Sequence, residues 1–201
     1  MNELNRSKSF SSTQFLTRVA ILSVISFLLM FVQVPLAFIA PPFLQLDISD
    51  VPALIGGFAM GPFAGICIEL VKNLLNLFIK GSITSGVGEL SNFIVGSSIV
   101  AISSLVYKNS KTYKGAIVGL LAGTLAMTAI AMASNFFVVF PLYGKIMGLD
   151  AIIQMGTAIT SHITDLWTMM VYAVMPFNLI KGIVISIVTL LVYKKVSHLL
   201  H

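Results

Sequence analysis

Apolar runs of 18 or more residues recur along this chain of 201 residues. Each run is long enough to cross the roughly 30 Å hydrocarbon core of a bilayer as a helix. Only 9% of the residues are charged, against about 25% in a typical soluble chain, so the pattern excludes a soluble domain. The sequence therefore predicts an all-α membrane protein that crosses the bilayer several times.

The apolar run at 51–79 is interrupted by the segment GGFAMGPFAG. As one helix, these 29 residues would extend roughly 43 Å, which is long for a single crossing. Pro62 would remove a backbone hydrogen bond from the helix interior, and Gly61 beside it is a poor helix former. We therefore predict a short helix, a break at Gly61–Pro62, and a longer helix after it.

Basic residues collect at the ends of the apolar runs, where positive charge orients a membrane protein and needs no nucleic acid to explain it. The three clusters are Arg6, Lys8 and Arg18; Lys108, Lys111 and Lys114; and Lys194 and Lys195. All three are cytoplasmic only if the chain breaks at Gly61–Pro62. We therefore predict six transmembrane helices with both termini cytoplasmic, in one domain of residues 1–201. The predicted helices are about 15–39, 51–60, 62–80, 89–107, 115–139 and 171–195.

Polar residues gather on the external side of this topology, although an ionised group inside a membrane costs about 2.5–3.5 kcal/mol on insertion scales. They are Asp47, Ser49, Asp50, Glu89, Asn92, Asn135, Asn178 and Lys181. The aromatic residues near them are Phe43, Phe93, Phe136, Phe137, Tyr143, Trp167 and Phe177. The long external segment 141–170 contains helix-like stretches, and we expect it to cover the outer surface rather than cross again.

Asn178 and Lys181 are three residues apart, so they share one face of a helix. An amide and an ammonium beside aromatic rings suit an uncharged heterocycle whose edge alternates carbonyl and N–H groups. Two simpler interpretations compete: Lys181 extends to the membrane interface, or the asparagines pack between helices. Glu69 and Lys72 are also three apart, and we expect a local ion pair between them.

The motifs of several enzyme classes are missing. The sequence has no G-x-x-x-x-G-K-[ST] phosphate loop and no His-Glu-x-x-His or Cys/His metal motif. Its only cysteine, Cys67, lies in an apolar run. Glu89 and the pair His162 and Asp165 are the only candidates for catalysis, so we expect a protein that is not an enzyme and binds no metal.

Four segments resemble motifs of one known family. They are DISDVPALIGGFAMGPFAGICIELVKNLL (47–75), GELSNFIVG (88–96), NFFVVFPLY (135–143) and PFNLIKG (176–182). In this order, and over nearly the whole chain, they resemble the riboflavin-binding S components of energy-coupling factor (ECF) transporters. The first motif is shared loosely with S components for other vitamins, and the last two are more specific to the riboflavin type.

The resemblance implies a six-helix protein of the bacterial cell membrane with a vitamin site at its external surface, covered by the first loop. It implies capture of riboflavin, with FMN as a second candidate ligand, and no cofactor. Delivery to the cytoplasm would require a separate ECF module of one transmembrane T component and two ATPases. The missing phosphate loop agrees with that division of labour.

The resemblance also implies roles for individual residues. It implies polar contacts to the vitamin from Asn135, Asn178 and Lys181. It places Leu44, Leu46 and Asp47 on the covering loop, and Gly88 and Glu89 on a second loop near the pocket. The family's first helix docks on the T component through small residues four apart, whereas here Ala20 is followed at that spacing by Val24. We therefore expect Ala20 with Ser23 to make this contact.

Three other hypotheses remain open at this point. The chain is an S component for another neutral heterocyclic vitamin, a small intramembrane enzyme, or a purely structural membrane subunit. Only the enzyme would show turnover from the chain alone, and only the structural subunit would bind no ligand.

Overall fold

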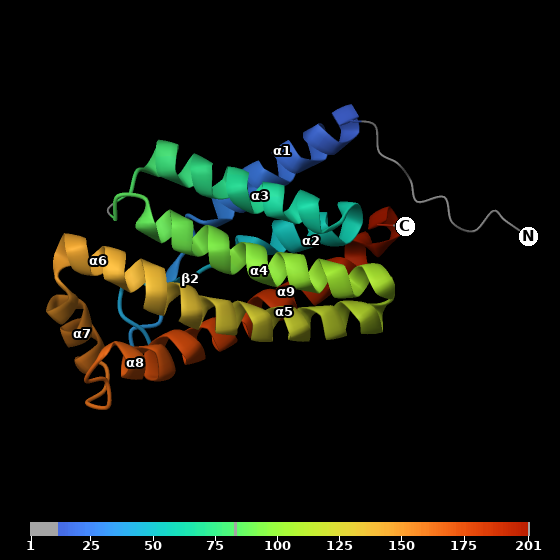
Figure 1. Cartoon of the computed structure of the whole chain (residues 1–201). Coiled ribbons are helices and arrows are strands. Elements are labelled where there is room, and N and C mark those ends of the chain that lie inside the picture. The colour runs from blue at the N-terminus through green and yellow to red at the C-terminus, as the bar shows by residue number, and fades with distance from the viewer. Residues whose placement is uncertain (1–11, 83, 201) are drawn as a thin grey trace, which may run out of the picture.

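The computed structural model describes residues 12–82 and 84–200, most of which are helical (Figure 1). In chain order the elements are α1 (Ser12–Leu29), β1 (Val34–Pro35), β2 (Gln45–Leu46), α2 (Asp50–Met60), α3 (Pro62–Leu75), η1 (Asn76–Lys80), α4 (Val87–Asn109), α5 (Tyr113–Ser134), η2 (Asn135–Val139), α6 (Phe140–Met147), α7 (Leu149–Thr157), α8 (Leu166–Met169), η3 (Met170–Val174) and α9 (Met175–Leu200). The η segments are π-helical turns within longer helices. Arg6 and Lys8 of the first basic cluster lie outside the described residues.

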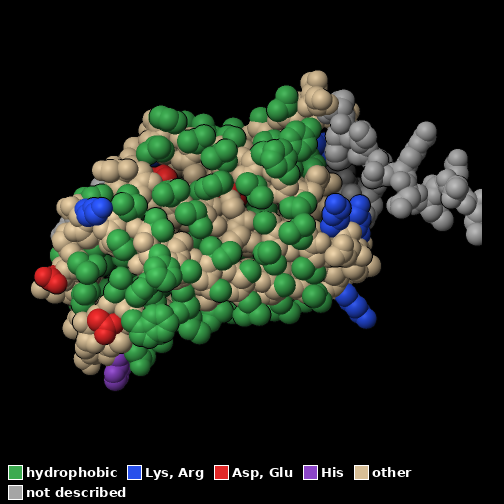
Figure 2. Space-filling model, in the orientation of Figure 1, with side chains coloured by type: hydrophobic (Ala, Val, Ile, Leu, Met, Phe, Trp, Pro, Cys, Tyr) green, Lys and Arg blue, Asp and Glu red, His purple; other side chains and the backbone are tan. Residues whose placement is uncertain are grey.

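Five helical runs among the described residues are long and apolar enough to cross a membrane. They are Ser12–Leu29, Pro62–Lys80, Val87–Asn109, Tyr113–Ile146 and Leu166–Tyr193. The space-filling view shows hydrophobic side chains along the length of this bundle, with charged side chains mainly toward its two ends (Figure 2). The chain is therefore an all-α membrane protein.

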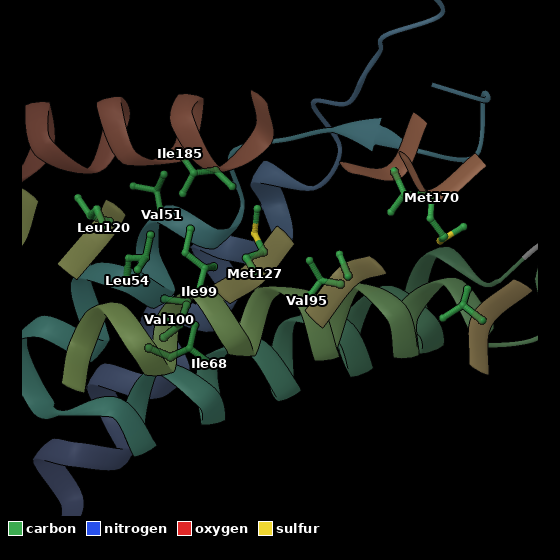
Figure 3. Close-up of a cluster of buried hydrophobic side chains, with 14 of the residues drawn as sticks. Val51, Leu54, Ile68, Val95, Ile99, Val100, Leu120, Met127, Met170 and Ile185 are labelled. Carbon is green, nitrogen blue, oxygen red and sulfur yellow. The ribbon is translucent and has the colours of Figure 1, made fainter. Parts of the chain in front are cut away.

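The helices pack in two groups. α4 packs along α5, and α5 packs along α9, while α1, α2 and α3 contact one another and join the first group through α4 and α9. The core between the groups contains fully buried apolar side chains, among them Leu54, Ile68, Ile99 and Leu120 (Figure 3). α1 is the most exposed of the five long helical runs, because only 22% of its most apolar stretch is buried.

The predicted break between the second and third helices is present. α2 ends at Met60 and α3 begins at Pro62, joined by Gly61 alone. Gly61 has φ 99° and ψ 166°, a backbone region that is open essentially only to glycine. Pro62 stands in the first turn of α3, where a missing N–H interrupts no hydrogen bond within the helix.

The predicted end of the first helix, at residue 39, is wrong. α1 ends at Leu29, and Val34–Pro35 then pairs antiparallel with Gln45–Leu46. The physical reason is Pro35, which cannot donate to a helical hydrogen bond and forces the residue before it into an extended conformation. The covering loop therefore runs from residue 30 to residue 49 and carries a short two-stranded ribbon.

The predicted end of the fifth helix, at residue 139, is also wrong. The helix continues from α5 through η2 into α6 and ends at Met147, beyond Pro141. Proline is tolerated because it stands in the first turn of α6, after the π-helical turn.

The last helix begins at Leu166, before the predicted start at residue 171. Its first turn is fixed by a capping box, in which the Asp165 carboxylate accepts the Thr168 N–H at 2.8 Å and the Thr168 hydroxyl accepts the Asp165 N–H at 3.0 Å. The Thr168 N–H also holds the pKa of Asp165 below its usual range. The two neighbouring helices take up both ends of the predicted external segment 141–170, which leaves only α7 and its connections outside them. α7 packs against α6 and α8 (Figure 1).

Candidate functional site

The candidate polar residues occupy the half of the bundle that leads to α6, α7 and the start of α8, here called the α7 end. The start of α1, the end of α9 and the turn between α4 and α5 lie at the opposite end (Figure 1). α2 has 11 residues and is therefore only about 16 Å long. Because α2 is so short, the loop that precedes it must enter the bundle and bring its polar side chains to roughly half the depth of the hydrocarbon core.

Asn135 and Asn178 are both buried, with 3% and 4% of their surface exposed. The side-chain amide of Asn135 donates to the Ala131 carbonyl at 2.7 Å, and that of Asn178 donates to the Val174 carbonyl at 2.8 Å. Asn135 begins the π-helical turn η2, and Val174 ends η3. Among the described residues, neither amide oxygen accepts a hydrogen bond. Each asparagine therefore keeps its oxygen as an acceptor, and a second N–H as a donor, for a ligand.

Lys181 lies on the same helix as Asn178, and 4% of its surface is exposed. Its Nζ is 3.3 Å from Asp47 Oδ2, 3.4 Å from Asp50 Oδ2 and 3.4 Å from Asn92 Oδ1. The structure therefore brings Lys181 together with Asp47 of the covering loop. Lys181 does not extend to the membrane interface, which was one of the competing interpretations of its role.

A buried ion network next to Lys181 includes contacts that the sequence analysis missed. The predicted ion pair between Glu69 and Lys72 is confirmed at 2.7 Å, but Lys72 Nζ also contacts Asp50 Oδ1 at 2.5 Å and Ser49 Oγ at 3.1 Å. None of these four residues exposes any surface. The pair expected to be local therefore joins α3 to the start of α2.

Glu89 lies in a separate polar cluster at the α7 end. Its carboxylate accepts the Asn76 amide at 3.2 Å and the Ser82 hydroxyl at 2.7 Å, so both its oxygens are bonded. A Cβ at Gly88 would lie 3.2 Å from Tyr143 Oη, which places the backbone of α4 close to that phenol. Gly88 and Glu89 belong to the first turn of α4 rather than to a loop.

Apolar contacts with α6 and with the core hold the covering loop in place. Phe43 packs edge-on against Phe140 and Tyr143, with ring centroids 5.7 Å and 5.8 Å apart. Leu44 packs against the buried core, and Leu46 is paired with Val34 in the strand ribbon. The structure therefore brings this loop over the part of the bundle that contains Asn135 and Lys181.

The two small residues of the first helix differ in exposure. Ala20 is exposed, whereas Ser23 is fully buried and donates its hydroxyl to the Val19 carbonyl at 2.7 Å. A shallow groove between α1 and α2 is lined largely by apolar side chains, including Ile21 and Ile55, and Ala20 is not among its lining residues.

The residues brought together here offer hydrogen-bonding groups, the Lys181 ammonium and aromatic rings to a ligand. Among the described residues, no group of three His, Cys, Asp or Glu side chains could hold a metal ion. His162 stacks on Tyr172 with the ring centroids 5.6 Å apart, and the Asp165 carboxylate is engaged at the start of α8.

Comparison with known proteins gives similarities over nearly the whole chain. The family model described as ECF transporter, substrate-specific component, matches residues 14–193. The riboflavin transporter RibU of Staphylococcus aureus (strain TCH60) is 40% identical over 196 residues, covering 97% of this chain and 96% of that protein. The riboflavin transporter FmnP of Bacillus subtilis (strain 168) is 36% identical over 180 residues, covering 89% and 90%. A solved structure of the S component of a bacterial ECF transporter is 38% identical, with a TM-score of 0.74, and covers 94% of this chain and 99% of that one.

Proposed function

The chain belongs to the family of substrate-specific components of ECF transporters, and from that membership we propose that it captures riboflavin at the external face of the bacterial cell membrane. Release into the cytoplasm requires a separate ECF module of a transmembrane T component and two ATPases. The relatives named riboflavin transporters, at 40% and 36% identity, support riboflavin over another vitamin.

The observation that carries this proposal is the burial of Asn135, Asn178 and Lys181 in one half of the bundle. The two amides keep acceptor and donor positions toward a ligand, and the ammonium adds further donors. The edge of a flavin ring alternates carbonyl and N–H groups, so this set of side chains can pair with it. Ribityl hydroxyls are a second set of partners for the same groups.

Five further residues complete the proposed ligand site: Leu44, Leu46, Asp47, Gly88 and Glu89. The first three belong to the covering loop, whose packing over the bundle supports a role in closing the site. Gly88 lets α4 approach Tyr143 closely, and Glu89 is held by two hydrogen bonds near this edge of the bundle. Aromatic stacking on the flavin ring would add about 0.5–1.5 kcal/mol beyond burial.

We propose six transmembrane helices, with α2 as the short one, in a single domain of residues 1–201. Both termini are cytoplasmic in this proposal. The five long apolar runs and the basic turn at Lys108, Lys111 and Lys114 support it, because that turn lies at the same end of the bundle as the start of α1 and the end of α9 (Figure 1).

Docking on the T component is proposed through α1, at Ala20 with Ser23. The exposure of Ala20 supports it as the contacting residue. Ser23 faces the interior, so it contributes by allowing α1 to pack closely on its neighbours.

The first test is purification of the chain in detergent from cells grown with riboflavin, followed by its visible absorption spectrum. Flavin bands that survive washing, with riboflavin released on denaturation, are the expected result. FMN in the released fraction would extend the ligand class to the phosphorylated flavin. A colourless protein that fails to quench the fluorescence of added riboflavin would overturn the assignment and favour another vitamin. Turnover of the flavin by the chain alone would instead favour the enzyme hypothesis.

A further inference from the structure

We propose that Asp50, held by Lys72, positions the vitamin-contacting ammonium of Lys181 without touching the vitamin. Asp50 and Lys72 are thus positioning residues, and this inference rests on the proposed function. The starting observation is that Lys181 lies between three acceptors, Asp47, Asp50 and Asn92, at 3.3–3.4 Å. A lysine ammonium is a compact charge on a flexible stem, so its direction is set by the groups around it.

Asp50 contacts both buried lysines with different oxygens. Oδ1 is 2.5 Å from Lys72 Nζ, and Oδ2 is 3.4 Å from Lys181 Nζ. Oδ2 is buried and has no hydrogen-bond partner among the described residues, and Lys181 Nζ lies 3.4 Å from it. A buried carboxylate oxygen strongly attracts a nearby ammonium, because charges interact more strongly in the low-dielectric interior than in water.

Asp50 is itself held in place. The Lys72 ammonium donates to Asp50 Oδ1 and to Ser49 Oγ, and it forms an ion pair with Glu69 Oε2 at 2.7 Å. The backbone of α4 supports the carboxylates from the other side, since a Cβ at Gly96 would lie 2.9 Å from Glu69 Cδ and 3.2 Å from Asp50 Oδ1. The carboxylate of Asp50 is therefore fixed in place beside Lys181.

Asp47 and Asp50 differ in what holds them. Asp47 belongs to the covering loop, which must move to admit a ligand, and its contact with Lys181 is lost when the loop lifts. Asp50 is the first residue of α2 and remains in contact with Lys72. The open site therefore keeps Lys181 pointed inward through Asp50 and Asn92. A group held in its binding geometry before the ligand arrives loses less entropy on binding, and affinity rises.

The test compares Asp50→Asn with Glu69→Gln, measuring the riboflavin Kd by fluorescence quenching in detergent. Each variant replaces a fully buried carboxyl group that contacts Lys72 with an amide, and of these two carboxyl groups only that of Asp50 is within ion-pair distance of Lys181. The Kd of the unchanged chain is measured first. Absence of riboflavin binding there would overturn the proposed function, and this inference with it.

We expect Asp50→Asn to raise the Kd about tenfold and Glu69→Gln to change it less than about twofold. In a Lys181→Met background, Asp50→Asn should change the Kd less than about twofold, because its effect acts through the ammonium already removed. Equal losses for Asp50→Asn in both backgrounds would overturn the inference. So would a loss with Glu69→Gln as large as that with Asp50→Asn.

A charge-conserving variant keeps the test decisive if Asp50→Asn alone does not fold. Asp50→Asn with Lys72→Met removes one negative and one positive charge, so the net charge of the network is unchanged. Its Kd should also rise about tenfold, and the rise should also disappear in the Lys181→Met background. A Kd equal to that of the unchanged chain would overturn the inference.

Discussion

Asn135 and Asn178 are oriented by their own helices. Each donates one amide N–H to the carbonyl four residues before it. This bond fixes the side chain and leaves the amide oxygen free for a ligand. Both bonds lie at a π-helical turn, a feature that is common at functional sites. At this scale, affinity is expected to come from side chains that are already fixed before the ligand binds.

Replacing Asn178 by leucine tests this view. Asn178→Leu keeps the volume similar but removes the amide, so about 1–3 kcal/mol of riboflavin binding should be lost, because ligand groups would be left unpaired. The Kd should rise by roughly 5- to 160-fold. The matched control is Thr128→Val, which removes a buried hydroxyl that donates to the Thr124 carbonyl at 2.9 Å on α5. Titration of both variants with riboflavin should show a change only in Asn178→Leu, and an unchanged Kd there would remove Asn178 from the site.

Single residues could be selected from the sequence, but their partners could not. An ionisable or amide side chain in an apolar segment is conspicuous, so Lys181 and both asparagines could be selected as candidates. The pair of Glu69 and Lys72 was also predicted, because three residues separate them along one helix. Asp50 reaches Lys72 from another helix, and no local spacing predicts that contact. The recurrence of polar residues at Glu69 and Asn73 of α3 and at Asn76 of η1 was the signal that could have indicated a larger network.

At the scale of elements, the break where Gly61 and Pro62 stand side by side was predicted, whereas the effects of the isolated prolines Pro35 and Pro141 were not. The connection at Gly61 was predicted because Gly61 and Pro62, which follow each other, both disfavour a continuous helix. The end of α1 was missed because the apolar run continues through Pro35. The end of the helix there depends on the backbone restrictions of proline rather than on hydrophobicity. The π-helical turns have no sequence pattern of their own, since they depend on the packing of whole helices.

Substitution of Gly61 tests the connection between α2 and α3. Gly61→Ala has open space for its methyl group, so the cost comes from the backbone alone. We expect it to lower the free energy of unfolding by about 1–3 kcal/mol, measured by thermal unfolding in detergent. The control is Gly86→Asn, because Gly86 also has a positive φ of 88° but a ψ of −7°, a region that asparagine tolerates. Equal stability of the two variants would contradict the strain assigned to Gly61.

At the scale of the whole molecule, the positions of basic residues and the helix count must agree on one orientation. The turn between α4 and α5 and the segment after α7 lie at opposite ends of the bundle (Figure 1). Ser110 is exposed in the first and Ser161 is exposed in the second. These two positions therefore report the two sides of the membrane.

Labelling of single cysteines in intact cells checks the proposed orientation. In a Cys67→Ala background, Ser161→Cys should react with a membrane-impermeant thiol reagent, and Ser110→Cys should react only after the cells are opened. The physical reason is the basic turn, which the positive-inside rule keeps in the cytoplasm. Labelling of Ser110→Cys in intact cells would refute both the six-helix count and the cytoplasmic termini.

The contacts of α2 also have a mechanical consequence. At one end, Gly61 alone joins α2 to α3, and at the other end the ion pair of Asp50 with Lys72 joins the same two helices. Because α2 and α3 are joined near both of their ends, they can neither slide nor turn against each other, and they move as one rigid unit. The movement that opens a path for a ligand must then come from parts not fastened in this way. The covering loop at 30–49 lies over the site, so it is the segment that moves while α2 and α3 stay in place.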